Sequence, residues 1–441
     1  MIDKQGVVYT DEEGDLVTSI VNQKDCVFTC YDETGDAGLA AGKNKCTARI
    51  LGGYMEGYGI IRGRLSRYRL FWTKNIYDRQ GAEQMFFSAV RENCAYHYRH
   101  CREYRKILKR SGFRPGQLES SRDIGRIPVL PTLFFKHHAL YSIAPECTWL
   151  KTTSSGTSGT ASQVNFDGGA LLCGLGMVAR TVSKRGLLSL RPARYVIFGY
   201  EPHRDNRTAV ARSTFGATFF APPLSRDYAL IYRQGQYIPD LEHVMDRLCR
   251  YSYGAVPVRI LGFPSYAYFA LKQMEERGIH LTLPGGSKMI LSGGWKQFEG
   301  QKVNKEVLYG LARRVLGIED KDVAEFFSAA EHPVLYCDCR NHHFHVPVYS
   351  QVIIRDIKTM EPLGYGRPGL VNLITPMIKA VPVLSVMTDD VGVLHVGKEC
   401  GCGIDAPYLE LLGRAGVSGI KTCAAGAQDI LNGTYGKEAA R

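Results

Sequence analysis

The spacing of apolar residues divides much of the chain into segments of two kinds. Short runs rich in β-branched and aromatic residues alternate with segments whose apolar residues recur every three or four positions. The strand-like runs are 195–199, 258–262, 288–291, 352–354, 370–375 and 381–387, and the helix-like segments include 240–251 and 266–277. Strands that alternate with helices predict parallel βαβ units, and therefore a layered α/β domain.

The first part of the chain shows a weaker pattern followed by one strong one. Residues 1–80 are rich in glycine and mixed charge, which predicts short hairpins at most, in a poorly defined N-terminal extension. From Gln84 to about Gly112, apolar residues recur with helical spacing beneath a dense series of arginines and lysines. This pattern predicts one continuous amphipathic helix with a basic outer face.

Composition excludes several classes of protein. The 441 residues are 45% hydrophobic and 22% charged, which is typical of a globular protein with a substantial core. No run approaches the roughly 18 apolar residues of a membrane span, and the first residues lack an apolar leader, so we expect a cytoplasmic protein. The net charge of +12 suits an anionic substrate. The same charge would suit a nucleic-acid-binding module, but no aromatic RNA-binding motif or zinc-finger spacing accompanies it.

A loop rich in glycine, serine and threonine is the most distinctive short motif. It spans Thr152–Thr160 and reads TTSSGTSGT. Such a loop offers unobstructed backbone N–H groups and hydroxyl donors, which a polyphosphate requires. It is not a Walker loop, because no Gly-Lys-Ser/Thr follows. A flexible linker has a similar composition. The strand-like residues that follow closely favour a phosphate-binding hairpin.

Four further motifs follow this loop in a definite order. They are GGWK at 293–296, FSAAEHP at 327–333, TDD at 388–390 and GR at 413–414. Together with SSGTSG they resemble the adenylate-forming superfamily, in particular the LuxE acyl-protein synthetases and their phenylacetate–coenzyme A ligase relatives, over about 84–427. The resemblance implies an adenylate-forming core of layered sheets and helices over 81–412. Residues 413–441 would then be a short remnant of the usual C-terminal subdomain.

The resemblance implies that ATP and Mg²⁺ bind here, and it assigns roles to particular residues. The phosphates would be held by the loop residues Ser155, Gly156, Thr157, Ser158 and Gly159. Gly293 and Gly294 would approach the adenine, and Glu331 would hold Mg²⁺. Asp390 and Arg414 would bind the ribose. Lys296 would meet a phosphate or carboxylate, or else face solvent. The lysine that often closes this loop in the superfamily is replaced, because the sequence runs TASQ over 160–163.

The resemblance also implies a reaction. A carboxylic acid, most readily a fatty acid, would be activated as acyl-AMP and transferred to a cysteine near the C-terminus, then to a partner reductase or acyl carrier. Cys423 is the only cysteine after the Gly-Arg motif, and Lys421 nearby would favour its thiolate. The alternative for Cys423 is a small buried thiol. For the whole chain the alternatives are a coenzyme A ligase and a nucleotide-binding protein that has lost catalysis.

A second group of residues has the composition of a metal site. The chain holds 13 cysteines, an odd number that argues against a disulfide framework. Two pairs are spaced two apart, Cys337 with Cys339 and Cys400 with Cys402, and histidines follow the first pair. By analogy with zinc-bearing phenylacetate ligase relatives, the predicted ligands of a structural Zn²⁺ are Cys339, His345, Cys400 and Cys402, with Cys337 as a substitute. If residues 337–345 form one strand, positions 337, 339, 343 and 345 share a face. The alternative is unconnected thiols and exposed histidines.

Overall fold

The computed structural model describes residues 9–10, 16–17, 66–154 and 161–414 of the chain. The chain divides into two compact units, Met1–Gly59 and Ile60–Arg441. In the first unit, β1 (Tyr9–Thr10) pairs antiparallel with β2 (Leu16–Val17). The core of the second unit includes Leu70, Phe71 and Ile76, which lie upstream of the predicted start at residue 81. The three-part division at residues 80 and 412 stays a prediction.

The helices and strands of the second unit have the following bounds. The helices are α3 (Ser66–Phe71), α4 (Arg79–His100), α5 (Arg102–Arg110), α6 (Thr132–His137), α7 (Gly168–Lys184), α8 (Ala209–Ala217), α9 (Leu241–Ser252), α10 (Pro264–Glu276) and α11 (Lys305–Leu316). The strands are β3 (Leu130–Pro131), β4 (Leu150–Thr153), β5 (Gln163–Phe166), β6 (Ala193–Tyr200), β7 (Pro223–Arg233), β8 (Gln236–Pro239), β9 (Val258–Gly262), β10 (Lys288–Ser292), β11 (Val323–Ala329), β12 (His332–Cys337), β13 (Phe344–His345), β14 (Gln351–Arg355), β15 (Gly369–Ile374), β16 (Ser385–His395) and β17 (Tyr408–Arg414).

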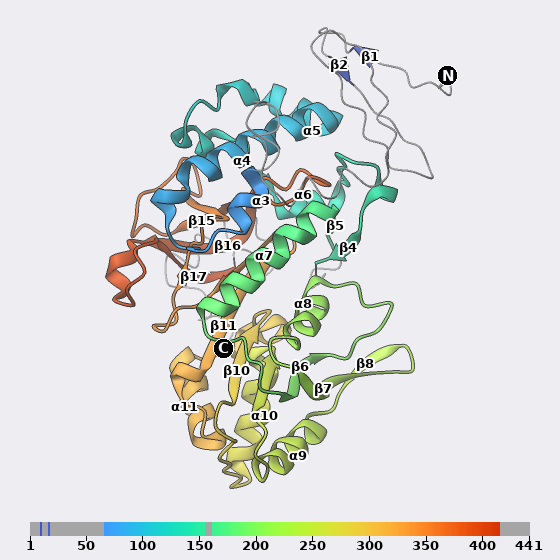
Figure 1. Ribbon diagram of the computed structural model, residues 1–441, viewed down its shortest axis with the longest axis vertical. Coiled ribbons are helices and arrows are strands. Elements are labelled where there is room, and N and C mark those ends of the chain that lie inside the picture. The colour runs from blue at the N-terminus through green and yellow to red at the C-terminus, as the bar shows by residue number, and fades with distance from the viewer. Residues whose placement is uncertain (1–8, 11–15, 18–65, 155–160, 415–441) are drawn as a thin grey trace. The chain divides into compact units, whose positions relative to one another are not determined.

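A seven-stranded sheet forms one layer of this unit, in the order β12-β11-β10-β9-β6-β7-β8 (Figure 1). Strands β7, β6, β9, β10 and β11 are parallel, and β12 and β8 pair antiparallel at the two edges. Alternate residues of β6 enter different cores. Val196 and Phe198 pack with apolar residues of α9, α10 and α11, whereas Tyr195 and Ile197 pack with Val182 of α7. Helices therefore cover both faces, as the α/β prediction requires.

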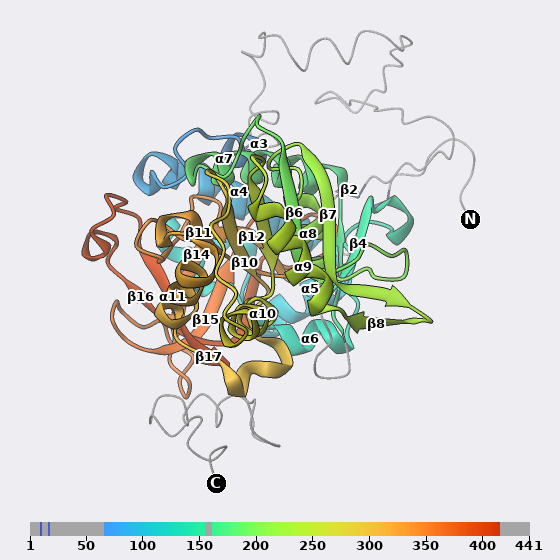
Figure 2. The ribbon, with the colours of Figure 1, turned by 90° about the horizontal axis from the view of Figure 1, so that it is seen from below.

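A second sheet orders β13-β17-β16-β15-β14, with β3 beside β16, and lies next to helices α3, α4 and α7 (Figures 1 and 2). Its long strands pair antiparallel. The strand-like runs 352–354, 370–375 and 381–387 fall in or beside this sheet, so the prediction that they form parallel units is wrong. The reason is that loops without helices join these strands, and such short connections favour antiparallel pairing.

The predicted basic helix is interrupted. Helix α4 ends at His100, Cys101 adopts an extended conformation (φ −121°, ψ 106°), and α5 begins at Arg102. Cys101 is fully buried, as are Tyr104 and Leu108 of α5. The break redirects the chain while keeping the apolar residues of both helices in one core, so the prediction of a single continuous helix is wrong. No described helix is both long enough and apolar enough to cross a membrane.

Candidate functional site

The carboxyl ends of the parallel strands carry glycine turns. β9 ends at Gly262 (φ 125°), and β10 is followed by Gly293 (φ 83°) and Gly294 (φ 67°). A Cβ atom on Gly262 would lie 2.2 Å from the carbonyl oxygen of Phe198, and one on Gly293 would lie 2.7 Å from the ring of Phe263. Only glycine fits these two positions. Because the exposed turn has no side chains, a flat ligand could approach its backbone closely, which is the role predicted for Gly293 and Gly294.

The phosphate-loop motif projects from a hairpin. Strands β4 and β5 pair antiparallel, with Thr153 opposite Gln163. Beyond that pair, the N–H of Ser154 donates to the carbonyl oxygen of Ser162 (3.0 Å), and the N–H of Ser162 donates to Oγ of Ser154 (2.9 Å). These bonds close the base of the loop. The predicted phosphate-binding residues Ser155–Gly159 lie outside the described residues.

A serine that the sequence did not single out links this hairpin to the sheet. The hydroxyl of Ser162 donates a hydrogen bond to Oε1 of Glu331, which is 5% exposed in the turn between β11 and β12. Burial raises the pKa of the Glu331 carboxyl, and the bond from Ser162 acts in the opposite direction. A divalent cation would favour the carboxylate form. Ser162 occupies the segment from which the usual loop lysine is missing, and sequence spacing alone could not show this partner.

The predicted ribose-binding pair lies on neighbouring strands of the second sheet. Asp390 on β16 is directly opposite Arg414 on β17, and Nε of Arg414 lies 3.4 Å from Oδ1 of Asp390. Burial raises the pKa of Asp390, and the Arg414 charge opposes this shift. The charge of the adjacent Asp389 raises the pKa of Glu331. This segment of β16 is therefore within electrostatic range of the turn that holds Glu331.

The four predicted metal ligands come together. One ligand atom from each of Cys339, His345, Cys400 and Cys402 lies within 4.8 Å of the others. The Sγ atoms of Cys339 and Cys400 are 3.5 Å apart, and Sγ of Cys402 is 3.2 Å from Nε2 of His345. Two thiolates on one tetrahedral Zn²⁺ would be about 3.8 Å apart, since each Zn–S bond is about 2.3 Å. The donor set and its spacing therefore suit zinc.

Neighbouring groups orient this cluster. Nδ1 of His345 lies 2.6 Å from the carbonyl oxygen of Ala406, so the ring donates there and directs Nε2 towards Cys402. Burial raises the pKa of Cys400 to about 12, and the thiols of Cys339 and Cys402 act in the same direction. Thiols held this close resist ionisation unless a cation is bound.

The local structure of this region differs from the prediction. Residues 337–345 do not form one strand, because β12 ends at Cys337 and a turn precedes β13. Cys337 packs with apolar residues of the seven-stranded sheet and does not join the cluster. The cluster instead connects the turn after β12 with the loop after β16, and so links the two sheets.

The side chains of two predicted catalytic residues are not described. Cys423 lies outside the described residues, and for Lys296 only the backbone, at the start of the 3₁₀ helix Lys296–Gln301, is described. Their predicted roles stay predictions, as do the assignments of Glu331 to Mg²⁺ and of Asp390 and Arg414 to ribose.

Solved structures define the class of the fold. An open conformation of 2-hydroxyisobutyryl-CoA ligase in complex with 2-HIB-AMP and CoA is 17% identical, with a TM-score of 0.59, and the match covers 83% of this chain and 80% of that one. The same ligase in the postadenylation state is also 17% identical, with a TM-score of 0.58 and coverage of 82% and 72%. The fold is that of adenylate-forming ligases.

The sequence comparisons identify the family within that class. The chain belongs to the LuxE family, described as acyl-protein synthetase, whose model matches residues 74–432. A long-chain-fatty-acid–luciferin-component ligase of Vibrio harveyi is 26% identical over 362 residues, which cover 80% of this chain and 89% of the relative. The ligase of the same name from Aliivibrio fischeri is 22% identical over 357 residues, covering 78% and 87%. The protein is therefore an AMP-forming ligase of the acyl-protein synthetase type.

Proposed function

We propose that the protein activates a long-chain fatty acid with MgATP and then transfers the acyl group to a thiol of its own. The names of the two relatives support the substrate class. The observation that supports the site most directly is the hydrogen bond from Ser162 to Glu331. It joins the base of the phosphate-loop hairpin to the carboxyl ends of the parallel strands, where α/β proteins commonly bind nucleotides.

In the first step, a carboxylate oxygen of the fatty acid attacks the α-phosphorus of ATP. A bond forms between them as the bond to the β-phosphate oxygen breaks, which leaves acyl-AMP and pyrophosphate. The loop N–H groups hold the phosphates, and Asp390 accepts hydrogen bonds from the ribose hydroxyls. Glu331 would hold Mg²⁺, which would supply positive charge against the phosphates. The fatty acid is itself the nucleophile, so this step requires no general base.

In the second step, the thiolate of Cys423 attacks the acyl carbonyl carbon. The carbon–oxygen bond to AMP breaks, AMP departs, and a thioester remains on the protein. Lys421 supports the thiolate by its charge. An acyl-accepting reductase or carrier would then receive the acyl group, and the cytoplasm is the compartment in which we expect these steps to occur.

We also propose that Cys339, His345, Cys400 and Cys402 bind one structural Zn²⁺. All four protein ligands are supplied, which is the arrangement of a closed structural site and not of a catalytic one with an open position. The ion would fix the link between the two sheets. Metal analysis of the purified protein tests this proposal, with about one zinc per chain as the expected result.

The proposed acyl transfer is tested by intact mass after incubation with MgATP and a panel of fatty and aromatic acids. The expected result is a mass increase equal to one acyl group with a long-chain acid, absent from the Cys423→Ser variant. Pyrophosphate release without a protein adduct would contradict the transfer to Cys423 and favour coenzyme A as acceptor. Absence of both products with every acid would leave only nucleotide binding.

A further inference from the structure

A pocket lined by three arginines lies at the amino ends of the parallel strands. The glycine turns lie at the opposite, carboxyl ends of these strands. The volume of the pocket is about 180 Å³, and its lining residues are Arg194, Arg247, Arg250, Tyr251, Gly254, Ala255 and Val256. Arg194 stands near the start of β6, and the other lining residues belong to the end of α9 and the loop that leads into β9. The rest of β6 separates this pocket from the glycine turns by about 20 Å.

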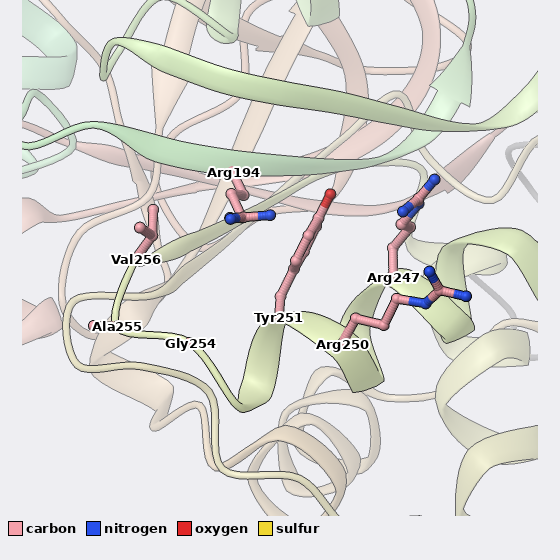
Figure 3. A pocket seen from close by; sticks show the side chains of 7 residues that line it. All are labelled: Arg194, Arg247, Arg250, Tyr251, Gly254, Ala255 and Val256. Carbon is pink, nitrogen blue, oxygen red and sulfur yellow. The ribbon is translucent and has the colours of Figure 1, made fainter.

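Tyr251 organises the pocket from its centre. Figure 3 shows Arg194 on one side of the Tyr251 ring, with Arg247 and Arg250 on the other. The guanidinium carbon of Arg194 lies 4.6 Å from the ring centroid, which is a cation–π contact. The Tyr251 hydroxyl donates to Oδ2 of Asp227 (2.6 Å), and this partly buried bond fixes the ring. The ring therefore holds Arg194 in place while leaving its N–H groups available.

Nearby carboxylates pair with only two of the three arginines. Asp227 lies 3.2 Å from Nε of Arg247, and Asp246 lies 2.9 Å from Nε of Arg250. Arg194 has no carboxylate partner among the described residues. The terminal Nη groups of all three arginines, which are the natural partners of phosphate oxygens, donate to no other described residue.

Ala255 and Val256 also line the pocket, and their N–H groups form no hydrogen bond with another described residue. The carbonyl end of α9 also lies here and disfavours an anion, but its partial charge is only about half a unit. Three guanidinium groups, two of them opposed by one carboxylate each, outweigh it.

We propose that this pocket binds a small polyanion that carries phosphate groups, at a site separate from the ATP site. Two observations favour a diphosphate-like ligand over a single anion. The arginines lie on both sides of the Tyr251 ring, and the available volume exceeds that of one phosphate. Free pyrophosphate and the diphosphate part of a larger molecule share this chemistry.

The test is a titration of the full-length protein with pyrophosphate at constant ionic strength and without Mg²⁺, followed by calorimetry. We expect Arg194→Gln and Arg250→Gln each to weaken the pocket's binding by about tenfold, because each removes a charged hydrogen-bonding group. Arg194→Lys should weaken it less. The matched control Arg102→Gln removes an exposed arginine of α5 and should leave it unchanged.

Several outcomes would overturn the proposal. They are no pyrophosphate binding by the unmodified protein, unchanged affinity in both pocket variants, or equally tight binding of citrate. Among described residues Arg250 pairs only with the exposed Asp246, so Arg250→Gln should fold. If Arg194→Gln does not fold, the affinity of Arg250→Gln for pyrophosphate tests the proposal. Pyrophosphate bound at the ATP site would keep its affinity in both pocket variants, which is one of the outcomes that overturn the proposal. Comparing pyrophosphate with ADP then distinguishes the free ion from a diphosphate within a larger ligand.

Discussion

The parallel strands of the seven-stranded sheet have two ends, here called the carboxyl edge and the amino edge, and these differ in how they present charge. At the carboxyl edge, where β9 and β10 end in glycine turns, the buried carboxyl of Glu331 accepts a hydrogen bond from the neutral hydroxyl of Ser162. At the amino edge, three arginines surround an open pocket. The first edge suits a phosphate ligand that arrives with a divalent cation, and the second suits a bare polyanion. One sheet can thus offer two phosphate sites of opposite local charge.

The two edges also differ in their effect on folding. Burial raises the pKa of Glu331, so its carboxylate opposes folding at neutral pH. Arg250 is 66% exposed on its side chain and remains solvated. Residues that oppose stability yet occupy a cleft are frequent in active sites. The comparison therefore predicts that variants at the carboxyl edge trade activity for stability, whereas those at the amino edge change neither strongly.

The largest expected effect is that of Glu331→Gln. The amide keeps an acceptor for Ser162 but cannot hold Mg²⁺ by charge, so ATP–pyrophosphate exchange should fall by about 10²–10³-fold. Its melting temperature should rise by about 1–3 °C at pH 8. That gain should vanish as the pH falls below the pKa of an unfolded glutamate, because the native carboxyl is then protonated. The exposed Glu276→Gln is the control, and equal effects from the two would contradict the role of Glu331.

The next effect in size concerns the cysteine–histidine cluster. Cys400→Ser and Cys402→Ser should each abolish the proposed zinc binding and reduce the free energy of unfolding by about 3–5 kcal/mol, because one change disables the whole site. Metal analysis and denaturant unfolding measure these quantities. The exposed Cys147→Ser should affect neither. If zinc were absent from the unmodified protein, the structural-zinc proposal would be wrong.

A smaller effect is expected at the second sheet. Asp390→Asn removes a charged acceptor from the predicted ribose site, so the KM for ATP should rise by about 10–100-fold with a smaller change in kcat. Asp356→Asn, in the half-buried start of the turn after β14 and outside the predicted ribose site, is the matched control. A fall in kcat at unchanged KM would show that Asp390 acts in the chemical step and not in nucleotide binding.

The smallest expected effect is a change in pH dependence. The hydrogen bond from Ser162 opposes the rise in the Glu331 pKa, so Ser162→Ala should raise that pKa further. Mg²⁺ requires the carboxylate form, and activity should therefore be lost at a higher pH as the solution is acidified. We expect a reduction of about twofold to tenfold at pH 6 and a smaller one at pH 8. Ser121→Ala, which removes a similar bond to the exposed Glu83, should leave the profile unchanged.

Parts of this architecture could be predicted because they depend on local pattern. The run at 258–262 is β9 at its observed bounds, and the spacing of Cys400 and Cys402 with an upstream cysteine and histidine indicated the cluster. The antiparallel sheet was not predicted, because a strand's apolar pattern does not specify the direction of its partner. The break at Cys101 was also missed, since its burial continues the helical spacing across the turn.

Other features depend on long-range contacts that no local pattern contains. Ser162 and Glu331 are 169 residues apart, and only the hairpin and the β11–β12 turn bring them together. Arg194 and Arg250 likewise come from different elements. Because they lie on separate segments, the sequence does not show that they meet, whereas the basic residues of α4 and α5 form one dense stretch of sequence.

We have proposed that the carboxyl edge activates a fatty acid through its adenylate. Exchange of labelled pyrophosphate into ATP, measured with and without a long-chain fatty acid, tests this proposal most directly. We expect exchange that requires both the acid and Mg²⁺, is lost in Glu331→Gln and persists in Arg250→Gln. Exchange that is absent with every acid, or that survives in Glu331→Gln, would contradict it.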